Sequence, residues 1–139
     1  MTRILAAALV AIAMGHGAQA ADAAAGAQIF AQRCATCHMV VAPNGNVLVK
    51  GGKTGPNQHG VIGRKAGSQG DFARYGDDLV AAGEKGLVWD EAQVIAYLDD
   101  PVAFLRSYLG DNSARSRMAF KLADEGQRAD VAAYLATLK

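Results

Sequence analysis

The C-terminal part of the chain carries the most regular pattern of apolar and polar positions. Four apolar residues follow the i, i+3, i+4, i+7 spacing of one helix face: Val131, Tyr134, Leu135 and Leu138. Asp124 precedes them and is a favourable N-cap, because its carboxylate can accept hydrogen bonds from the free N–H groups of a first helical turn. The sequence therefore predicts a final helix that starts at Asp124.

Two shorter helices are predicted on either side of Pro101. Asp90 is a suitable N-cap for the first, whose apolar positions have helical spacing: Val94, Ile95 and Leu98. This helix should end before Pro101, because the residue that precedes a proline disfavours the α conformation. Proline is favourable in a first helical turn, so the next helix can begin there and stop at Gly110. Its apolar face consists of Phe104, Leu105 and Tyr108.

A fourth helix is predicted from Asp22, as N-cap, through Arg33, with Ile29 and Phe30 on its buried side. Residues 39–88 differ from these helical regions, because they hold 11 of the 16 glycines and little sustained periodicity. A structureless loop longer than about 15 residues is uncommon in a compact domain. Scattered apolar side chains argue against disorder, so we expect this stretch to wrap around a large apolar cofactor: Val61, Ile62, Phe72, Tyr75 and Leu79.

The N-terminus has the pattern of a cleaved secretory signal peptide. Arg3 precedes an apolar run over residues 4–14, and Ala18 and Ala20 form an A-x-A cleavage site. The run is shorter than the roughly 20 residues that a membrane-spanning helix needs. We therefore expect residues 1–20 to be removed, leaving one domain over residues 21–139 in the periplasm.

Charge is distributed in blocks along this mature region, although its formal total is zero. The net charge is +4 over residues 21–70, −6 over residues 71–100 and +3 over residues 101–121. Such blocks could orient the protein toward a charged partner, or they could simply form a solubilising surface. Without a basic excess, and with aromatic residues making up only 6% of the chain, nucleic-acid binding is not expected.

The only two cysteines lie in a C-x-x-C-H motif formed by Cys34, Cys37 and His38. This motif is typical of c-type haem attachment, in which both thiols form thioethers and the histidine binds the iron. A disulfide would leave the histidine unexplained, and a thioredoxin-like motif should lie beside a βαβ pattern. A closed zinc site needs four ligands, and His16 and His59 do not supply zinc-finger spacing.

A second iron ligand is expected on the opposite face of the haem. Two methionines lie in the predicted leader, and Met39 directly follows His38, so the same turn cannot carry it to the other face. Met118, in an irregular segment between two predicted helices, is the favoured ligand. The alternatives are that Met118 is an ordinary core residue, or that His59 is the ligand.

These residues form part of an ordered series of motifs between Gly26 and Leu135. The chain resembles the class I cytochromes c, and most closely the cytochrome c2 subgroup of α-proteobacteria. The matching motifs are G-x-x-x-F at Gly26 and Phe30, C-A-T-C-H at 34–38, T-G-P-N at 54–57, G-R-K at 63–65, Tyr75, Trp89, Y-L-x-x-P at 97–101, M-x-F at 118–120 and A-Y-L at 133–135.

The resemblance implies an all-α cytochrome c fold, with about four to five helices and long glycine-rich loops around one covalently bound haem c. It implies thioethers at Cys34 and Cys37, axial ligation by His38 and Met118, and a hydrogen bond from His38 to the Pro56 carbonyl. It also implies that Arg64 lies near a haem propionate, that Tyr75 and Trp89 donate hydrogen bonds to the buried propionate, and that Tyr97 lies near the methionine sulfur.

Two positions depart from the family pattern. Gln58 stands where the family usually has leucine, which places a polar group near the proximal side of the haem. Val102 stands where a lysine is common, so the basic rim around the haem edge is thinned. Four basic residues could still surround that edge: Arg33, Arg115, Arg117 and Lys121.

The function implied by the resemblance is that of a monomeric, soluble periplasmic electron carrier, not an enzyme. Its transient partners would be redox proteins such as a bc1-type complex, a photosynthetic reaction centre or a cytochrome oxidase. A c-type haem with an open iron would instead suit a peroxidase or a gas sensor. A third possibility is a cytochrome held permanently in a larger complex.

Overall fold

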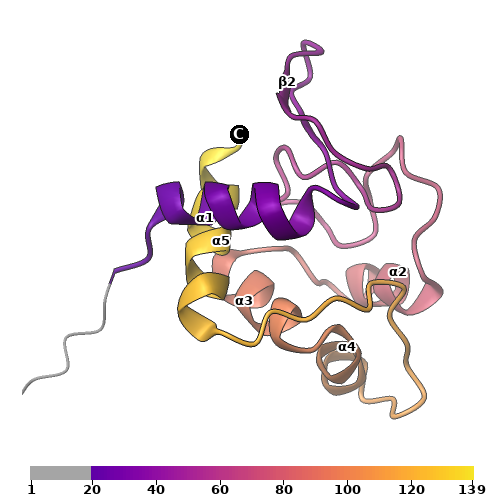
Figure 1. The fold of residues 1–139 in the computed structure, drawn as a ribbon. Coiled ribbons are helices and arrows are strands. Elements are labelled where there is room, and N and C mark those ends of the chain that lie inside the picture. Colours follow the sequence, from indigo (N-terminus) through magenta and orange to yellow (C-terminus); the bar gives the residue numbers. More distant parts are fainter. Residues whose placement is uncertain (1–19) are drawn as a thin grey trace, which may run out of the picture.

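The computed structural model describes residues 20–139, so nearly all of the predicted signal peptide lies outside the described residues. These residues form five α-helices and one small hairpin, arranged as in Figure 1. The helices are α1 (Ala23–Ile29), α2 (Asp77–Glu84), α3 (Glu91–Asp99), α4 (Pro101–Leu109) and α5 (Glu125–Thr137), and the strands are β1 (Val40–Val41) and β2 (Val47–Val49). Within residues 20–139, no helix has the length and apolar character needed to cross a bilayer.

The predicted helix starts are confirmed, because each depends on a local hydrogen bond. Asp22, Asp90 and Asp124 cap α1, α3 and α5, each accepting from backbone N–H groups of the first turn. Asp100 ends α3 and caps α4. Gly110 ends α4 in the left-handed conformation, with φ of 71°.

The predicted first helix continues to Cys34, but its last turn is wider than an α-helix. Residues Phe30–Cys34 form a π-helical turn, labelled η1, that leads directly into the C-x-x-C-H motif. A π turn shifts the direction of the following side chains, and such turns are frequent at functional sites.

Helices α1 and α5 cross each other at one side of the fold (Figure 1), and α3 packs against α5. The α1–α5 contact depends on Gly26, because a Cβ there would lie 1.9 Å from the backbone oxygen of Asp130. Beside it, Phe30 is 2% exposed and its ring centroid lies 5.6 Å from that of Tyr134. The G-x-x-x-F motif is thus explained by close helix packing.

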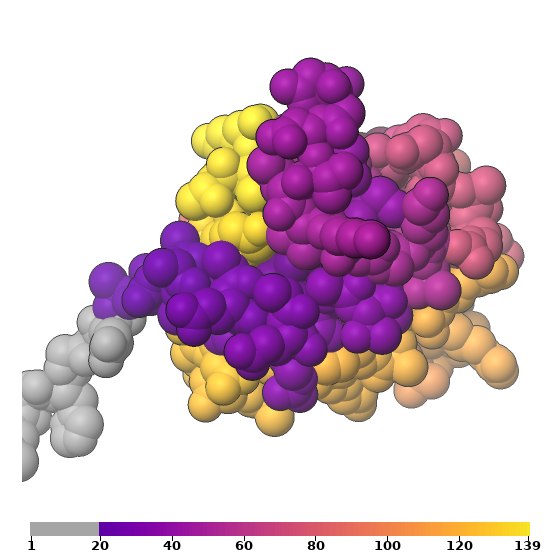
Figure 2. All heavy atoms as spheres, turned by 45° about the horizontal axis from the view of Figure 1, so that its top comes forward, coloured from indigo at the N-terminus to yellow at the C-terminus, as the bar shows by residue number. Residues whose placement is uncertain are grey.

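The glycine-rich region contains two elements that the sequence pattern did not predict. Helix α2 lies near its end, and β1 and β2 pair antiparallel near its start. The hairpin stands out from the body of the protein (Figure 2). The apolar side chains of Val47 and Leu48 on β2 are about half exposed, whereas Val40 on β1 is fully buried, so the hairpin joins the core through its first strand.

Candidate functional site

A cavity of about 640 Å³ lies between the helices and the glycine-rich loops. The nine residues that the motif and the resemblance assigned to cofactor or iron binding all line this cavity: Cys34, Cys37, His38, Pro56, Arg64, Tyr75, Trp89, Tyr97 and Met118. The rest of the lining is mainly apolar and includes Phe30, Leu98 and Phe120. A cavity of this size and lining fits a large, flat apolar group.

His38 is fixed by the turn that contains both cysteines. The backbone N–H groups of Cys37 and His38 both donate to the Cys34 carbonyl, at 3.1 and 2.9 Å. His38 Nδ1 lies 2.8 Å from the Pro56 carbonyl oxygen, and because a carbonyl can only accept, Nδ1 carries the hydrogen. Burial lowers the pKa of His38, an effect partly opposed by this hydrogen bond. The imidazole is therefore suited to be neutral, with its Nε2 lone pair available to a metal.

Gly55 provides the space that the His38 ring occupies. A Cβ at this position would lie 2.3 Å from His38 Cε1 and 2.6 Å from Nδ1. Only glycine leaves room for the ring here, so the T-G-P-N motif has a steric function as well as providing the Pro56 acceptor.

The two cysteines are not bonded to each other. Cys34 is partly buried against the core, and burial raises the pKa of its thiol to about 11, whereas Cys37 is exposed. Residues 20–139 contain no group of three His, Cys, Asp or Glu side chains that could hold a metal ion.

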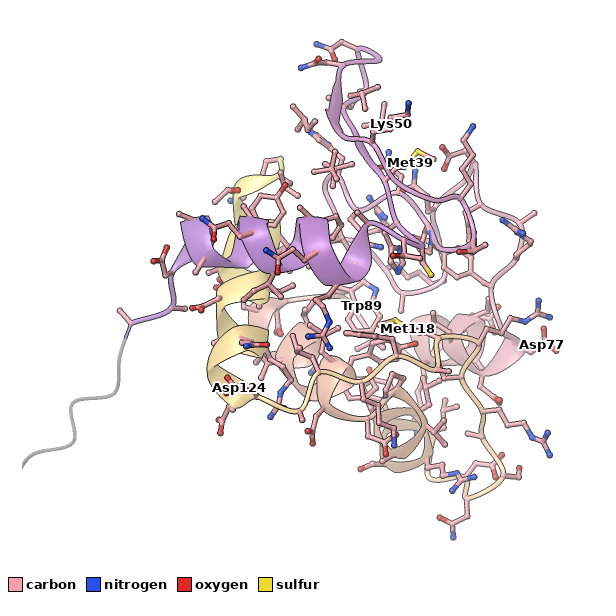
Figure 3. All side chains as sticks on the ribbon, in the orientation of Figure 1. Met39, Lys50, Asp77, Trp89, Met118 and Asp124 are labelled. Carbon is pink, nitrogen blue, oxygen red and sulfur yellow. The ribbon has the colours of Figure 1, made fainter. Side chains whose placement is uncertain are left out.

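Met118 comes to the cavity from the loop between α4 and α5. Figure 3 places Met118 and Trp89 in the central region of the molecule and Met39 at the base of the hairpin. Of Met118, Met39 and His59, Met118 alone lines the cavity, so the fold favours it over His59 as a ligand.

The Met118 loop is held by hydrogen bonds at both ends. Ser116 Oγ accepts from the Met118 N–H at 3.1 Å and lies 3.0 Å from the Tyr97 hydroxyl oxygen. Farther along, the Leu122 N–H donates to the Leu98 carbonyl at 2.8 Å. The buried Arg128 donates to the Leu122 and Ala123 carbonyls. Sequence reasoning assigned no role to Ser116 or Arg128, because their partners are defined only by the fold.

Arg64 brings a positive charge to the cavity. Its guanidinium donates to the backbone carbonyls of Asn57 and His59, and within the described residues it makes no ion pair with a carboxylate. Desolvation lowers its pKa, and desolvation raises the pKa of the neighbouring Tyr75 phenol. A half-buried cation without a carboxylate partner fits an anionic group of a bound cofactor.

Trp89 forms the wall next to Tyr97. It is 9% exposed, and its ring contacts the Tyr97 ring edge-on at 5.1 Å and stacks near Phe104 at 6.1 Å. Its backbone N–H donates to the Arg64 carbonyl at 2.9 Å. This pairing fixes the loop that carries Arg64 relative to the aromatic cluster.

The expected basic rim is present in part. Arg33, Arg115 and Arg117 line the cavity together with Lys65 and Arg74. The Arg33 guanidinium lies over the Phe120 ring, 5.5 Å from its centroid. Lys121 does not line the cavity and is instead paired with Asp100 at 2.5 Å. Lys121 is held there by a carboxylate that the fold brings within its reach.

Comparisons with known proteins agree in sequence and in fold, although no protein-family model matches the chain. Cytochrome c-551 of Roseobacter denitrificans is 55% identical over 117 residues, which cover 84% of this chain and 81% of that protein. Cytochrome c2 of Rhodobacter capsulatus is 47% identical over 135 residues, covering 97% of this chain and 96% of that protein.

Solved structures match over most of the described residues. The crystal structure of cytochrome c2 from Rhodobacter sphaeroides aligns with a TM-score of 0.82 at 44% identity, over 85% of this chain and 96% of that chain. Ferric cytochrome c-550 from Paracoccus versutus aligns with a TM-score of 0.79 at 47% identity, over 85% and 98% of the two chains. The expected all-α fold is confirmed.

Proposed function

The chain belongs to the cytochrome c2 family, whose members are electron carriers with one covalently bound haem c, and from this premise we propose that it is a His/Met-ligated periplasmic electron carrier. The observation that carries the proposal is the single cavity lined by both cysteines, His38 and Met118. These side chains supply the two thiols and the two axial donors that such a cofactor requires.

Each of these residues has a distinct task in the proposal. Cys34 and Cys37 would hold the cofactor through thioethers, and His38 and Met118 would bind its iron. When bound, the haem supplies reversible Fe(III)/Fe(II) chemistry that takes up and releases one electron. Pro56 fixes the orientation of the His38 ring through the 2.8 Å hydrogen bond, which also raises the basicity of the imidazole.

Several features favour a raised potential and a filled coordination sphere. A methionine ligand and an apolar, largely buried site both favour the ferrous state. Arg64, Tyr75 and Trp89 line the cavity and would offset a propionate charge, and Tyr97 holds the Met118 loop through Ser116. If His38 and Met118 both bound the iron, no position would stay open for the substrate of a peroxidase or the ligand of a gas sensor.

The basic residues at the cavity mouth are proposed as the docking face for redox partners. Arg33, Arg115 and Arg117 would frame the exposed edge of the cofactor. A bc1-type complex as donor, and a reaction centre or cytochrome oxidase as acceptor, would then associate briefly through complementary charge. Association rates should fall steeply as ionic strength rises, and rates that do not depend on salt would contradict this docking face.

Residues 1–20 are proposed as the signal peptide and residues 21–139 as a single, monomeric domain. The apolar run and the A-x-A site support this division. The mass of the secreted protein should correspond to a chain that begins at Ala21 plus one haem.

The experiment that tests the carrier function is an equilibrium redox titration of the purified holoprotein. A carrier should show one reversible transition with the slope of a one-electron couple, about 59 mV per tenfold change in the ratio of oxidised to reduced protein. Irreversible titration, or catalytic consumption of hydrogen peroxide by the untreated protein, would contradict the proposal.

A further inference from the structure

The side chain of Gln58 lies against the proximal histidine instead of pointing to solvent. Its amide nitrogen Nε2 is 3.0 Å from His38 Nδ1 and 3.1 Å from the Pro56 carbonyl oxygen. Three polar groups therefore meet at one point behind the imidazole, where a leucine would offer none.

The chemistry of these groups decides which hydrogen bonds form. His38 Nδ1 donates its hydrogen to Pro56, so it cannot also accept one from Gln58. The Gln58 N–H must then donate to the Pro56 carbonyl, whose oxygen has a second lone pair. The opposite amide orientation would place the Gln58 oxygen next to the Pro56 oxygen, and two acceptors repel each other. The Pro56 carbonyl thus accepts from both Gln58 and His38.

The backbone around Gln58 is held firmly enough to fix this arrangement. The Gln58 N–H donates to the Met39 carbonyl at 3.0 Å. The neighbouring Asn57 side chain pairs with the backbone of Val41, accepting at 3.0 Å and donating at 2.8 Å. These bonds tie the loop that carries Gln58 to residues 39–41, which directly follow the C-x-x-C-H motif and begin the hairpin.

We propose that Gln58 is a positioning residue that raises the reduction potential of the bound haem by sharing the Pro56 carbonyl with His38. This inference rests on the proposed ligation by His38. A carbonyl that accepts two hydrogen bonds is a weaker acceptor for each of them. The His38 N–H is then polarised less, the imidazole donates less electron density to the iron, and the ferric state loses stabilisation.

The orientation of the amide dipole acts in the same direction. Its positive N–H end points toward Pro56 and His38, and a positive potential on this side disfavours the more positively charged ferric iron. Replacement of Gln58 by an apolar residue should therefore lower the potential.

The test is an equilibrium redox titration of the holoprotein and three variants. Gln58→Leu and Gln58→Met replace the amide donor with an apolar side chain of similar size. Gln127→Leu is the matched control, because Gln127 is exposed on α5 and does not line the cavity. At a fixed solution potential, we expect both Gln58 variants to have a ferric-to-ferrous ratio about threefold higher than that of the unmodified protein. At 59 mV per tenfold for one electron, this corresponds to a reduction potential that is lower by about 28 mV.

The outcomes separate this inference from the function on which it rests. The role of Gln58 would be overturned if Gln58→Leu and Gln58→Met had a reduction potential equal to, or higher than, that of Gln127→Leu. The far-red sulfur-to-iron absorption band should be the same in all four proteins, because Gln58 lies on the histidine side. Absence of that band from the unmodified holoprotein would instead contradict the proposed axial ligation, whatever the Gln58 variants do.

Discussion

The hydroxyl oxygens of Tyr97 and Ser116 lie 3.0 Å apart and join α3 to the loop that carries Met118. Tyr97 is 8% exposed, so its hydroxyl depends on this partner. Ser116 also accepts from the Met118 N–H, and one serine therefore connects the buried tyrosine to the backbone of the proposed ligand.

Removal of the Ser116 hydroxyl should weaken the Met118 loop. Ser116→Ala leaves the Tyr97 hydroxyl buried without this partner, and we expect a loss of about 1–2 kcal/mol in the free energy of unfolding. The far-red sulfur-to-iron band should also disappear at a lower temperature than in the unmodified protein. Ser107→Ala, on the exposed face of α4, is the control. Equal stability of the two variants would show that the contact does not hold the loop.

A side chain at position 55 should disturb the proximal histidine. Gly55→Ala places a methyl group 2.3 Å from His38 Cε1, so the ring must move and its bond to Pro56 must lengthen. We expect a loss of stability of about 1–3 kcal/mol, typical of overpacking, together with a lower haem content in the purified protein. Gly70→Ala is the control, because a Cβ there meets nothing within 4 Å. A normal haem content in Gly55→Ala would contradict the steric argument.

Arg128 and Asp99 form an ion pair at 3.0 Å, but they should contribute unequally to the free energy of unfolding. The Arg128 side chain is 10% exposed and also donates to the Leu122 and Ala123 carbonyls, whereas the Asp99 side chain is 62% exposed. Arg128→Ala should cost about 2–3 kcal/mol, because hydrogen bonds from a charged donor are lost at a buried site. Asp99→Asn should cost less than about 1 kcal/mol, as expected for an exposed pair. Denaturant unfolding distinguishes the two, and similar losses would contradict the assignment.

The Asp100–Lys121 pair should make the stability of the folded protein decrease as the pH falls into the acid range. The pKa of Asp100 lies below its ordinary value, chiefly because Lys121 donates to its carboxylate and also because the Ala103 and Val102 N–H groups do so. A carboxyl whose pKa is lower in the folded state stabilises the protein above its unfolded pKa. That contribution is lost as the pH falls through the folded pKa.

Asp100→Asn keeps a helix-capping side chain and removes the charge. It should lower Tm at pH 7, and the difference from the unmodified protein should shrink as the pH falls below about 4. Thermal unfolding at a series of pH values measures this. Lys121→Met should show the same pH dependence as Asp100→Asn. If the difference in Tm between Asp100→Asn and the unmodified protein were the same at pH 7 and pH 2.5, a charge effect would be contradicted.

The helices that the sequence predicts correctly are those whose ends depend on nearby residues. Asp90, Asp124 and Pro101 act on their own first turns, so their effects can be read without the fold. Helix α2 was missed because Gly76 provides no side-chain cap and Leu79 and Val80 alone give no clear period. The hairpin was missed because its strands have only two and three residues, too few for an alternating pattern, and because β2 exposes Val47 and Leu48.

The site was predictable where one local motif fixes the chemistry, as at Cys34, Cys37 and His38. The resemblance then supplied Pro56, Arg64 and Met118, and the fold brings all of them to one cavity. The placement of Gln58 could not be read in this way, because it depends on a hydrogen bond to Met39 and on the path of the loop past the hairpin. The pairing of Lys121 could not be read for a similar reason, since its partner Asp100 lies 21 positions away in the sequence.

The visible spectrum of the ferrous holoprotein with and without carbon monoxide tests the central claim most directly. If His38 and Met118 occupy both axial positions, the spectrum should not change when carbon monoxide is added. Met118→Ala should then bind carbon monoxide, and Met39→Leu should behave as the unmodified protein does. Ready binding of carbon monoxide by the unmodified protein would mean that the iron has an open position, and it would contradict the account of this protein as a closed electron carrier.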